Sequence, residues 1–136
     1  DVKKKDVEPH IFGEEQKKGF FFNPTIIPTA STDMKICNFE VLGPIAPIIT
    51  AKDEDEAIKI ANSTDFGLGA SIWTRDIKRA QRLAKRIRAG VIAINGMVKS
   101  DPRLPFGGIK KSGIGRELSH YGLKEFVNIK TVMVNK

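Results

Sequence analysis

The sequence predicts an α/β domain built on a parallel sheet with crossover helices. Segments 44–52, 69–74 and 91–95 are apolar and have the composition of strands, and segments 53–61 and 77–89 between them have helical periodicity. Strands that alternate with helices form parallel sheets, because each helix carries the chain back to the edge where the next strand begins. With 136 residues, the chain has the length of one domain that can bury a core.

The first strand and helix of this pattern meet at Asp53. Residues 44–52 are rich in isoleucine, which is typical of a strand buried on both faces, although Pro47 favours an edge or a bulge in its first part. Asp53 can cap the helix, and Glu56 occupies the capping-box position. The expected apolar stripe of this helix consists of Ala57, Ile58, Ile60 and Ala61.

The second helix is predicted from Ile77 to Ala89, with Thr74 or Asp76 as its cap and Gly90 as the residue that ends it. Its buried face is expected to consist of Ile77, Ala80, Leu83, Ala84 and Ile87. The strand 91–95 after it is apolar throughout, which favours a central position in the sheet.

The two ends of the chain differ from this central pattern. Residues 1–19 are polar and are expected to lie on the surface or to be mobile. Thr25–Ile27 has the composition of a short strand, and residues 29–43 predict a loop with one helical turn. Residues 116–126 predict a helix, and residues 127–135 alternate like a final strand.

The net charge of +7 raises the question of nucleic-acid binding, since many basic domains bind phosphate backbones. The basic residues are scattered apart from one cluster between Lys78 and Arg88, and no aromatic residues alternate with them as on a base-stacking surface. A solvated helix face explains the cluster better, so we expect no nucleic-acid partner. We also expect no membrane partner, because no apolar run reaches the roughly 18 residues of a membrane span.

The single cysteine, Cys37, excludes an internal disulfide and fits a reducing compartment, so we expect a cytoplasmic location. It is the only candidate sulfur nucleophile, but His10 and His120 are distant in the sequence, and a small, half-buried apolar side chain is the favoured interpretation. No His, Cys, Asp and Glu residues have a recognisable metal-ligand spacing. Because residue 1 is a polar residue other than Met, we expect the chain to be part of a longer one.

Residues 104–118 hold the densest cluster of glycines in the chain. Gly113 and Gly115 begin like a dinucleotide-binding fingerprint, but Leu118 occupies the third glycine position, and no phosphate-binding Walker loop is present. The segment follows strand 91–95, and ligands of parallel sheets bind beyond the carboxyl ends of the strands. On these grounds two interpretations stay open, a ligand site and a tight loop that lets a helix pack.

Several motifs in one order along the chain are together highly specific. They are Asn23–Ile27, Glu40–Pro44, Ala61–Leu68, Gly90–Asn95, Pro105–Glu117 and Tyr121–Leu123. So arranged, they resemble the C-terminal part of the aldehyde dehydrogenase superfamily, from about Gly19 to the end of the chain. Details at Ser100-Asp101 and over residues 117–132 are most similar to the succinate-semialdehyde dehydrogenase branch.

Composition marks residues 1–19 as a polar segment, and the resemblance implies a partial catalytic α/β domain 20–128 and an oligomerisation strand 129–136. The family oxidises small aldehydes to carboxylates through a thioester, with NAD or NADP as the cofactor. Its C-terminal strand pairs with another subunit, so the resemblance implies a homo-oligomer.

The resemblance also implies site residues. Glu40 stands where the family's glutamate hydrogen-bonds the hydroxyls of the nicotinamide ribose. Leu42 replaces a phenylalanine that packs near the nicotinamide ring, and Phe39 replaces a second glutamate. Phe106 is expected to line the aldehyde pocket, with Ser100 as a further polar contact.

The family's nucleophilic cysteine and its glutamate base lie upstream of the matched region, and Cys37 does not match the nucleophile. No catalytic residue is therefore assigned in this chain. We expect a fragment of an NAD(P)-dependent aldehyde dehydrogenase that is inactive alone and binds no cofactor by itself. The alternatives are a non-catalytic, self-associating domain and, less favoured, a basic nucleic-acid-binding module.

Overall fold

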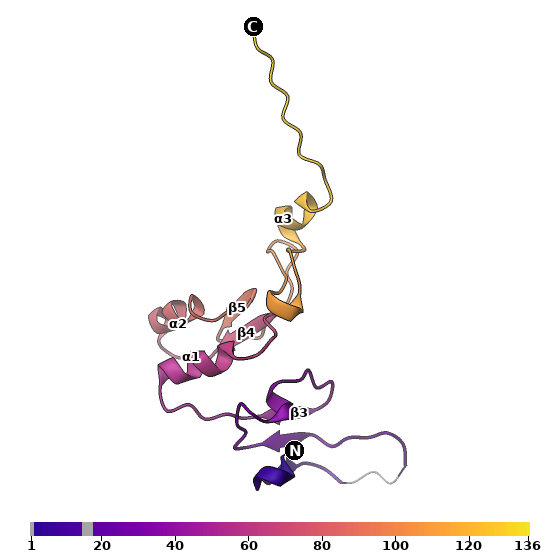
Figure 1. Ribbon diagram of the computed structural model, residues 1–136, viewed down its shortest axis with the longest axis vertical. Helices are drawn as coiled ribbons and strands as arrows, with labels where there is room; N and C mark the ends of the chain where they lie inside the picture. The colour runs from indigo at the N-terminus through magenta and orange to yellow at the C-terminus, as the bar shows by residue number, and fades with distance from the viewer. Residues whose placement is uncertain (1, 15–17) are drawn as a thin grey trace. The chain divides into compact units, whose positions relative to one another are not determined.

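The computed structural model describes residues 2–14 and 18–136, and these divide into two compact units, Asp1–Thr64 and Asp65–Lys136 (Figure 1). The division between the units falls after Thr64, and not at residue 19 or residue 128, where the sequence predicts domain boundaries. The roles predicted for segments 1–19, 20–128 and 129–136 stay predictions. Residues 15–17 of the polar segment lie outside the described residues.

The first unit is built on a three-stranded sheet in the order β1-β2-β3. Strand β2 (Thr25–Ile27) pairs in antiparallel fashion with β1 (His10–Ile11) and in parallel with β3 (Ile45–Pro47). The short 3-10 helices η1 (Lys3–Lys5) and η2 (Lys35–Cys37) complete the unit, together with α1 (Glu54–Asn62). Its core cluster consists of Ile27, Ala30 and Met34.

The strand expected over residues 44–52 is much shorter than predicted. Only Ile45–Pro47 is a strand, and Ala46, Pro47 and Ile48 are exposed, so burial on both faces is wrong. Proline has no N–H with which to continue a ladder, and among the described residues β3 pairs with β2 alone. The edge position that Pro47 favours is thereby confirmed.

Helix α1 begins where the sequence predicts. The Asp53 side chain accepts a hydrogen bond from the Glu56 N–H at 2.8 Å, and the Glu56 carboxylate accepts one from the Lys52 N–H at 2.7 Å. In a standard capping box the Glu56 carboxylate would accept from the N–H of the cap residue Asp53, so the observed bond lies one residue earlier in the chain. The apolar stripe is only partly correct, because Ile58 and Ile60 are half-buried whereas Ala57 and Ala61 are exposed.

The second unit contains a parallel pair of strands, β4 (Gly69–Ile72) and β5 (Val91–Ile94), with helix α2 (Ile77–Ala84) between them in the sequence. Ala80 of α2 is fully buried, while Ile77 at its start is exposed. The Asp76 side chain caps the helix by accepting from the Arg79 N–H at 2.9 Å. The described residues thus form two small sheets in place of the one predicted sheet, and the central position expected for residues 91–95 is not seen.

Gly90 does not end helix α2, which stops at Ala84. Its backbone instead passes so close to the glycine-rich segment that a Cβ on Gly90 would lie 1.7 Å from the Gly107 carbonyl oxygen. The carbonyl of Gly67 accepts hydrogen bonds from the N–H groups of both Gly90 and Ile109, each at 3.0 Å. We call the meeting point of Gly67, Gly90, Gly107 and Gly108 the glycine junction.

The chain after the junction ends in one short helix and an unpaired segment. Helix α3 spans Ser119–Lys124, inside the range predicted for it. Gly122 is buried there, and a Cβ on it would lie only 2.8 Å from the Glu117 carbonyl carbon. No strand follows α3 in the described chain, so the strand predicted over residues 127–135 is wrong for this chain alone. A strand forms only against a neighbour, and this segment has none here.

We expect Gly90→Ala to lower the free energy of unfolding of the chain by about 3 kcal/mol or more, because the new methyl group meets backbone that cannot move aside. Gly96→Ala is the matched control, since the nearest atom to a Cβ there is 3.9 Å away. Urea unfolding followed by circular dichroism measures both. Equal stability of the two variants would contradict the close approach at the junction.

Candidate functional site

The glycine-rich segment folds into a closed hairpin. The backbones of Phe106 and Glu117 exchange two hydrogen bonds of 2.8 Å each, so they form the base of what we call the glycine-rich hairpin, residues 106–117. Its tip contains the 3-10 helix η3 (Lys110–Ser112). The hairpin confirms that this is an ordered, tightly folded loop.

Three further contacts hold the hairpin on the chain before β4. The Ser112 hydroxyl accepts from the Gly67 N–H at 2.9 Å, and the Lys111 ammonium group pairs with the Asp65 carboxylate at 2.6 Å. The Lys111 N–H also donates to the Asp65 carbonyl at 3.0 Å. The hydrogen bond from Lys111 lowers the pKa of Asp65, but both side chains are largely exposed, so the ion pair itself contributes little to stability.

The carboxyl ends of β4 and β5 are joined by Asn95. Its side-chain amide accepts from the Thr74 N–H and donates to the Thr74 carbonyl, both at 2.8 Å, and its φ of 52° lies in the left-handed region. Asparagine tolerates that region better than most residues. The sequence analysis did not predict this role of Asn95. The available signal was an asparagine directly after the apolar segment 91–94.

The base of the hairpin leads into two consecutive residues with positive φ, Leu118 at 63° and Ser119 at 54°. Such backbone is strained for residues other than glycine and persists only where neighbouring contacts enforce it. Here the Ser119 N–H donates to the Pro102 carbonyl at 3.0 Å. The strained pair thus fixes the direction in which the chain leaves the hairpin.

The structure places the predicted site residues in two groups. Phe106 is half-buried at the base of the hairpin, and Ser100 is exposed in the loop that leads to it; both lie in the second unit. Glu40 and Leu42 are exposed in the segment after η2 of the first unit. Among the described residues the Glu40 carboxylate has no hydrogen-bond or ion-pair partner, so it is available to accept bonds from a ligand.

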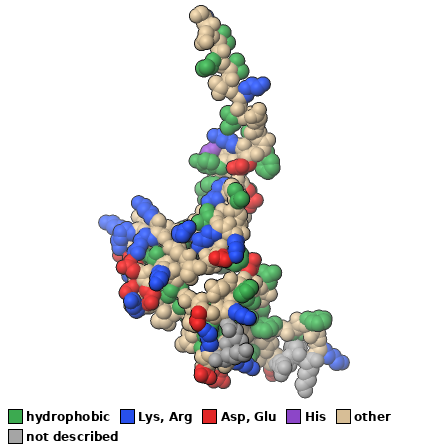
Figure 2. Space-filling model, viewed as in Figure 1, with side chains coloured by type: hydrophobic (Ala, Val, Ile, Leu, Met, Phe, Trp, Pro, Cys, Tyr) green, Lys and Arg blue, Asp and Glu red, His purple; other side chains and the backbone are tan. Residues whose placement is uncertain are grey.

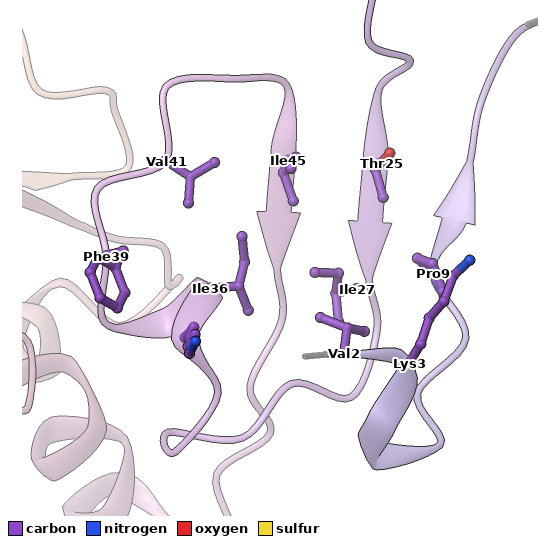
Figure 3. A pocket seen from close by; sticks show the side chains of 10 residues that line it. Val2, Lys3, Pro9, Thr25, Ile27, Ile36, Phe39, Val41 and Ile45 are labelled. Atoms are coloured by element: carbon purple, nitrogen blue, oxygen red, sulfur yellow. The ribbon is translucent and has the colours of Figure 1, made fainter.

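An apolar groove of about 540 Å³ lies over the sheet of the first unit (Figure 3). Sequence reasoning missed it. Phe39 and Val41 line the groove. Their sequence neighbours Glu40 and Leu42 do not. The lining residues are Val2, Lys3, Pro9, Thr25, Ile27, Lys35, Ile36, Phe39, Val41 and Ile45.

Cys37 is half-buried against the core cluster of the first unit, as its favoured interpretation predicts. Burial raises the pKa of its thiol, and the negative charge of Asp33 raises it further. Asp33 itself is held ionised by hydrogen bonds from Lys5 and Ser31, which lower its pKa to about 2. A thiol in this environment is a poor nucleophile at neutral pH, because the reactive species is the thiolate.

The basic cluster of the second unit lies on the exposed side of α2 and the turn after it, where Lys and Arg side chains gather (Figure 2). Lys78, Arg82 and Lys85 are all exposed, which agrees with a solvated helix face. Within the described residues, no helix is both long and apolar enough to cross a membrane.

Comparison with known proteins settles the family. The sequence model of the aldehyde dehydrogenase family matches residues 1–132. The chain belongs to the aldehyde dehydrogenase family. It is 51% identical over 118 residues to a succinate-semialdehyde dehydrogenase [NADP(+)] 1 from Mycobacterium tuberculosis, a match that covers 87% of this chain and 26% of the relative.

Solved structures of family members have the same fold as this chain. Succinate-semialdehyde dehydrogenase from Burkholderia pseudomallei superposes with a TM-score of 0.87 and 39% identity, over 96% of this chain and 27% of that one. Succinic semialdehyde dehydrogenase from Streptococcus pyogenes, in complex with NADP+, superposes with a TM-score of 0.85 and 38% identity, over 94% of this chain and 29% of that one. The chain therefore spans about a quarter of the length of the relatives that it matches.

We expect Cys37 to react with iodoacetamide more slowly at pH 7 than an unhindered cysteine peptide, because its raised pKa leaves less thiolate. Asp33→Asn removes a nearby negative charge, so it should lower the pKa of the thiol and speed alkylation, while burial keeps the rate below that of the peptide. The rate is measured by mass spectrometry between pH 6 and pH 10. Alkylation of the unaltered chain at the peptide's rate or faster would contradict this assignment.

Proposed function

We propose that this chain supplies the ribose-binding carboxylate and one wall of the aldehyde pocket to an NAD(P)-dependent aldehyde dehydrogenase that oxidises succinate semialdehyde. The observation that carries the proposal is the 51% identity to a succinate-semialdehyde dehydrogenase over most of this chain. It is supported by the family match and by the ordered hairpin around Phe106. A free cysteine without a disulfide partner fits the reducing cytoplasm as the location.

Glu40 is the residue proposed to hold the cofactor. A carboxylate can accept hydrogen bonds from both hydroxyls of one ribose, and the exposed, unpartnered state of Glu40 among the described residues fits that task. Leu42, which is 92% exposed, offers an apolar side chain for the nicotinamide ring. The bound cofactor would accept the hydride of the oxidation. Some structures of relatives contain NAD+ and one contains NADP+, so both cofactors stay within the proposal.

Phe106 and Ser100 are proposed to contact the aldehyde. Phe106 presents an aromatic surface from a backbone that is hydrogen-bonded on both sides of the hairpin base. Ser100 adds a hydroxyl next to a loop that is stiffened by Asp101 and Arg103, whose side chains form two bonds of 2.9 and 2.6 Å. An apolar wall with one polar contact is typical of small-molecule pockets.

The oxidation itself needs a thiolate that attacks the aldehyde, and a base that activates water for release of the acyl group. Cys37 is the only thiol of the chain, and its raised pKa makes it unsuitable as that nucleophile. We propose that the 136-residue chain by itself neither oxidises aldehydes nor binds NAD or NADP, and that its site residues act only beside the residues that supply the chemistry.

We expect no NADPH or NADH from the purified chain with succinate semialdehyde. A chimera in which this chain replaces the matching quarter of the Mycobacterium tuberculosis enzyme should be active. In the chimera, Glu40→Gln should raise the KM for NADP+ about tenfold, as expected for loss of a hydrogen bond to a charged group. Phe106→Ala should raise the KM for the aldehyde, so each variant is the control for the other.

Absorbance at 340 nm measures both activities. Turnover by the chain alone that disappears in Cys37→Ala would contradict the assignment of Cys37. An inactive chimera that is folded by circular dichroism would contradict the proposed function.

The segment after α3 is proposed to pair with a second copy of the chain. Ile129, Val132 and Val134 are exposed at 74%, 76% and 85%, and the segment has no pairing partner among the described residues. An extended segment with unpaired N–H and C=O groups is a template for strand addition. The same observation favours the second candidate function, a self-associating domain without catalysis.

We expect the chain to self-associate, and we expect removal of residues 129–136 to shift it towards the monomer. Analytical ultracentrifugation of both forms measures the change. Val132→Pro is a milder variant, since proline cannot donate a ladder hydrogen bond. An unaltered 136-residue chain that is strictly monomeric would contradict pairing through this segment.

A further inference from the structure

Arg116 makes a pair of contacts that the proposed function does not explain. Its guanidinium Nη1 donates to the Gly108 carbonyl at 3.0 Å and to the Gly115 carbonyl at 2.6 Å. No carboxylate pairs with it in the described part of the chain, and the residue is half-buried. A charged donor that is used on two backbone carbonyls, in place of an ion pair, acts on the shape of the backbone.

One of these contacts crosses the glycine-rich hairpin, and the other is local. Gly108 lies on the outgoing arm, two residues after Phe106, whereas Gly115 and Arg116 lie on the returning arm, directly before Glu117. The hydrogen bond from Arg116 to Gly108 therefore ties the two arms together next to the Phe106–Glu117 pair, while the bond to Gly115 holds the guanidinium group on its own arm. The outgoing arm also lies close to the stem of the side chain, since a Cβ on Gly107 would lie 3.2 Å from the Arg116 Cδ.

The two carbonyls also explain why the position suits arginine. A guanidinium group is planar and presents several N–H donors in a fixed fork, so it can hold two acceptors at once in a defined geometry. A lysine ammonium group is a compact charge on a flexible stem and fixes direction less well. Gly108 is buried and belongs to the glycine junction, so the arm that Arg116 grips is itself anchored to the unit.

We infer that Arg116 is a positioning residue for the aldehyde pocket: by bridging the two arms of the glycine-rich hairpin it fixes the place of Phe106 and thereby sets the KM for the aldehyde. The inference rests on the proposed role of Phe106 in the pocket wall and adds a specificity-determining residue that does not touch the substrate.

The experiment uses the chimera described above, with Arg116→Met, Arg116→Lys and the exposed helix arginine variant Arg82→Met as the control. Arg116→Met should raise the KM for succinate semialdehyde about tenfold and leave the KM for NADP+ and kcat within about twofold. Arg116→Lys should give an intermediate KM, and Arg82→Met should not change it. Hydrogen exchange at the amides of Phe106 and Glu117 should become at least tenfold faster in Arg116→Met.

The outcomes separate this inference from the function on which it rests. If Phe106→Ala leaves the aldehyde KM unchanged, the pocket wall itself is misassigned. If Phe106→Ala raises that KM but Arg116→Met does not, or if exchange at Phe106 and Glu117 is unchanged, the positioning role is overturned. If Arg116→Met does not fold, Arg116→Lys decides: an aldehyde KM equal to that of the unaltered chimera contradicts the inference.

Discussion

The close approach of backbone at the glycine junction is the constraint on which the second unit depends. The chain can pass from α2 into β5 beneath the hairpin only because Gly90 has no side chain, since a Cβ would lie 1.7 Å from the Gly107 carbonyl oxygen. The Gly67 carbonyl uses both of its acceptor directions there, for Gly90 and for Ile109. The glycine junction thus joins the start of β4, the start of β5 and the hairpin. These contacts hold the backbone that carries the proposed pocket wall.

The hydrophobic core, in contrast, is small. The buried apolar residues of the described chain are Ile27, Ala30, Met34 and Ala80. Large apolar side chains are exposed in both units, such as Phe39 in the first and Phe126 in the second. This agrees with relatives about four times as long, in which more polypeptide is available to cover such surface.

Sequence reasoning succeeded where structure is decided locally. The caps at Asp53 and Asp76 depend on residues three positions apart, and the structure forms both bonds. The strand Thr25–Ile27 and the pair β4 and β5 also follow from short apolar runs. Prediction failed where a distant partner decides: residues 127–135 have strand periodicity, but no strand of the described residues pairs with them.

Gly90 shows the same limit. In the sequence it stands where a helix ends, and only the position of Gly107, seventeen residues later, reveals why a glycine is needed.

The segment after η2 shows how one short stretch can serve two tasks. Phe39 and Val41 line the apolar groove of the first unit, while Glu40 and Leu42 do not. Phe39 is 68% exposed and Val41 is 42% exposed, so both line the groove and still leave much of their apolar surface in solvent. Phe39 stands where the resemblance implies a second glutamate, and a phenylalanine has no atom that accepts a hydrogen bond from a ribose hydroxyl. The proposed ribose contact therefore depends on the Glu40 carboxylate alone.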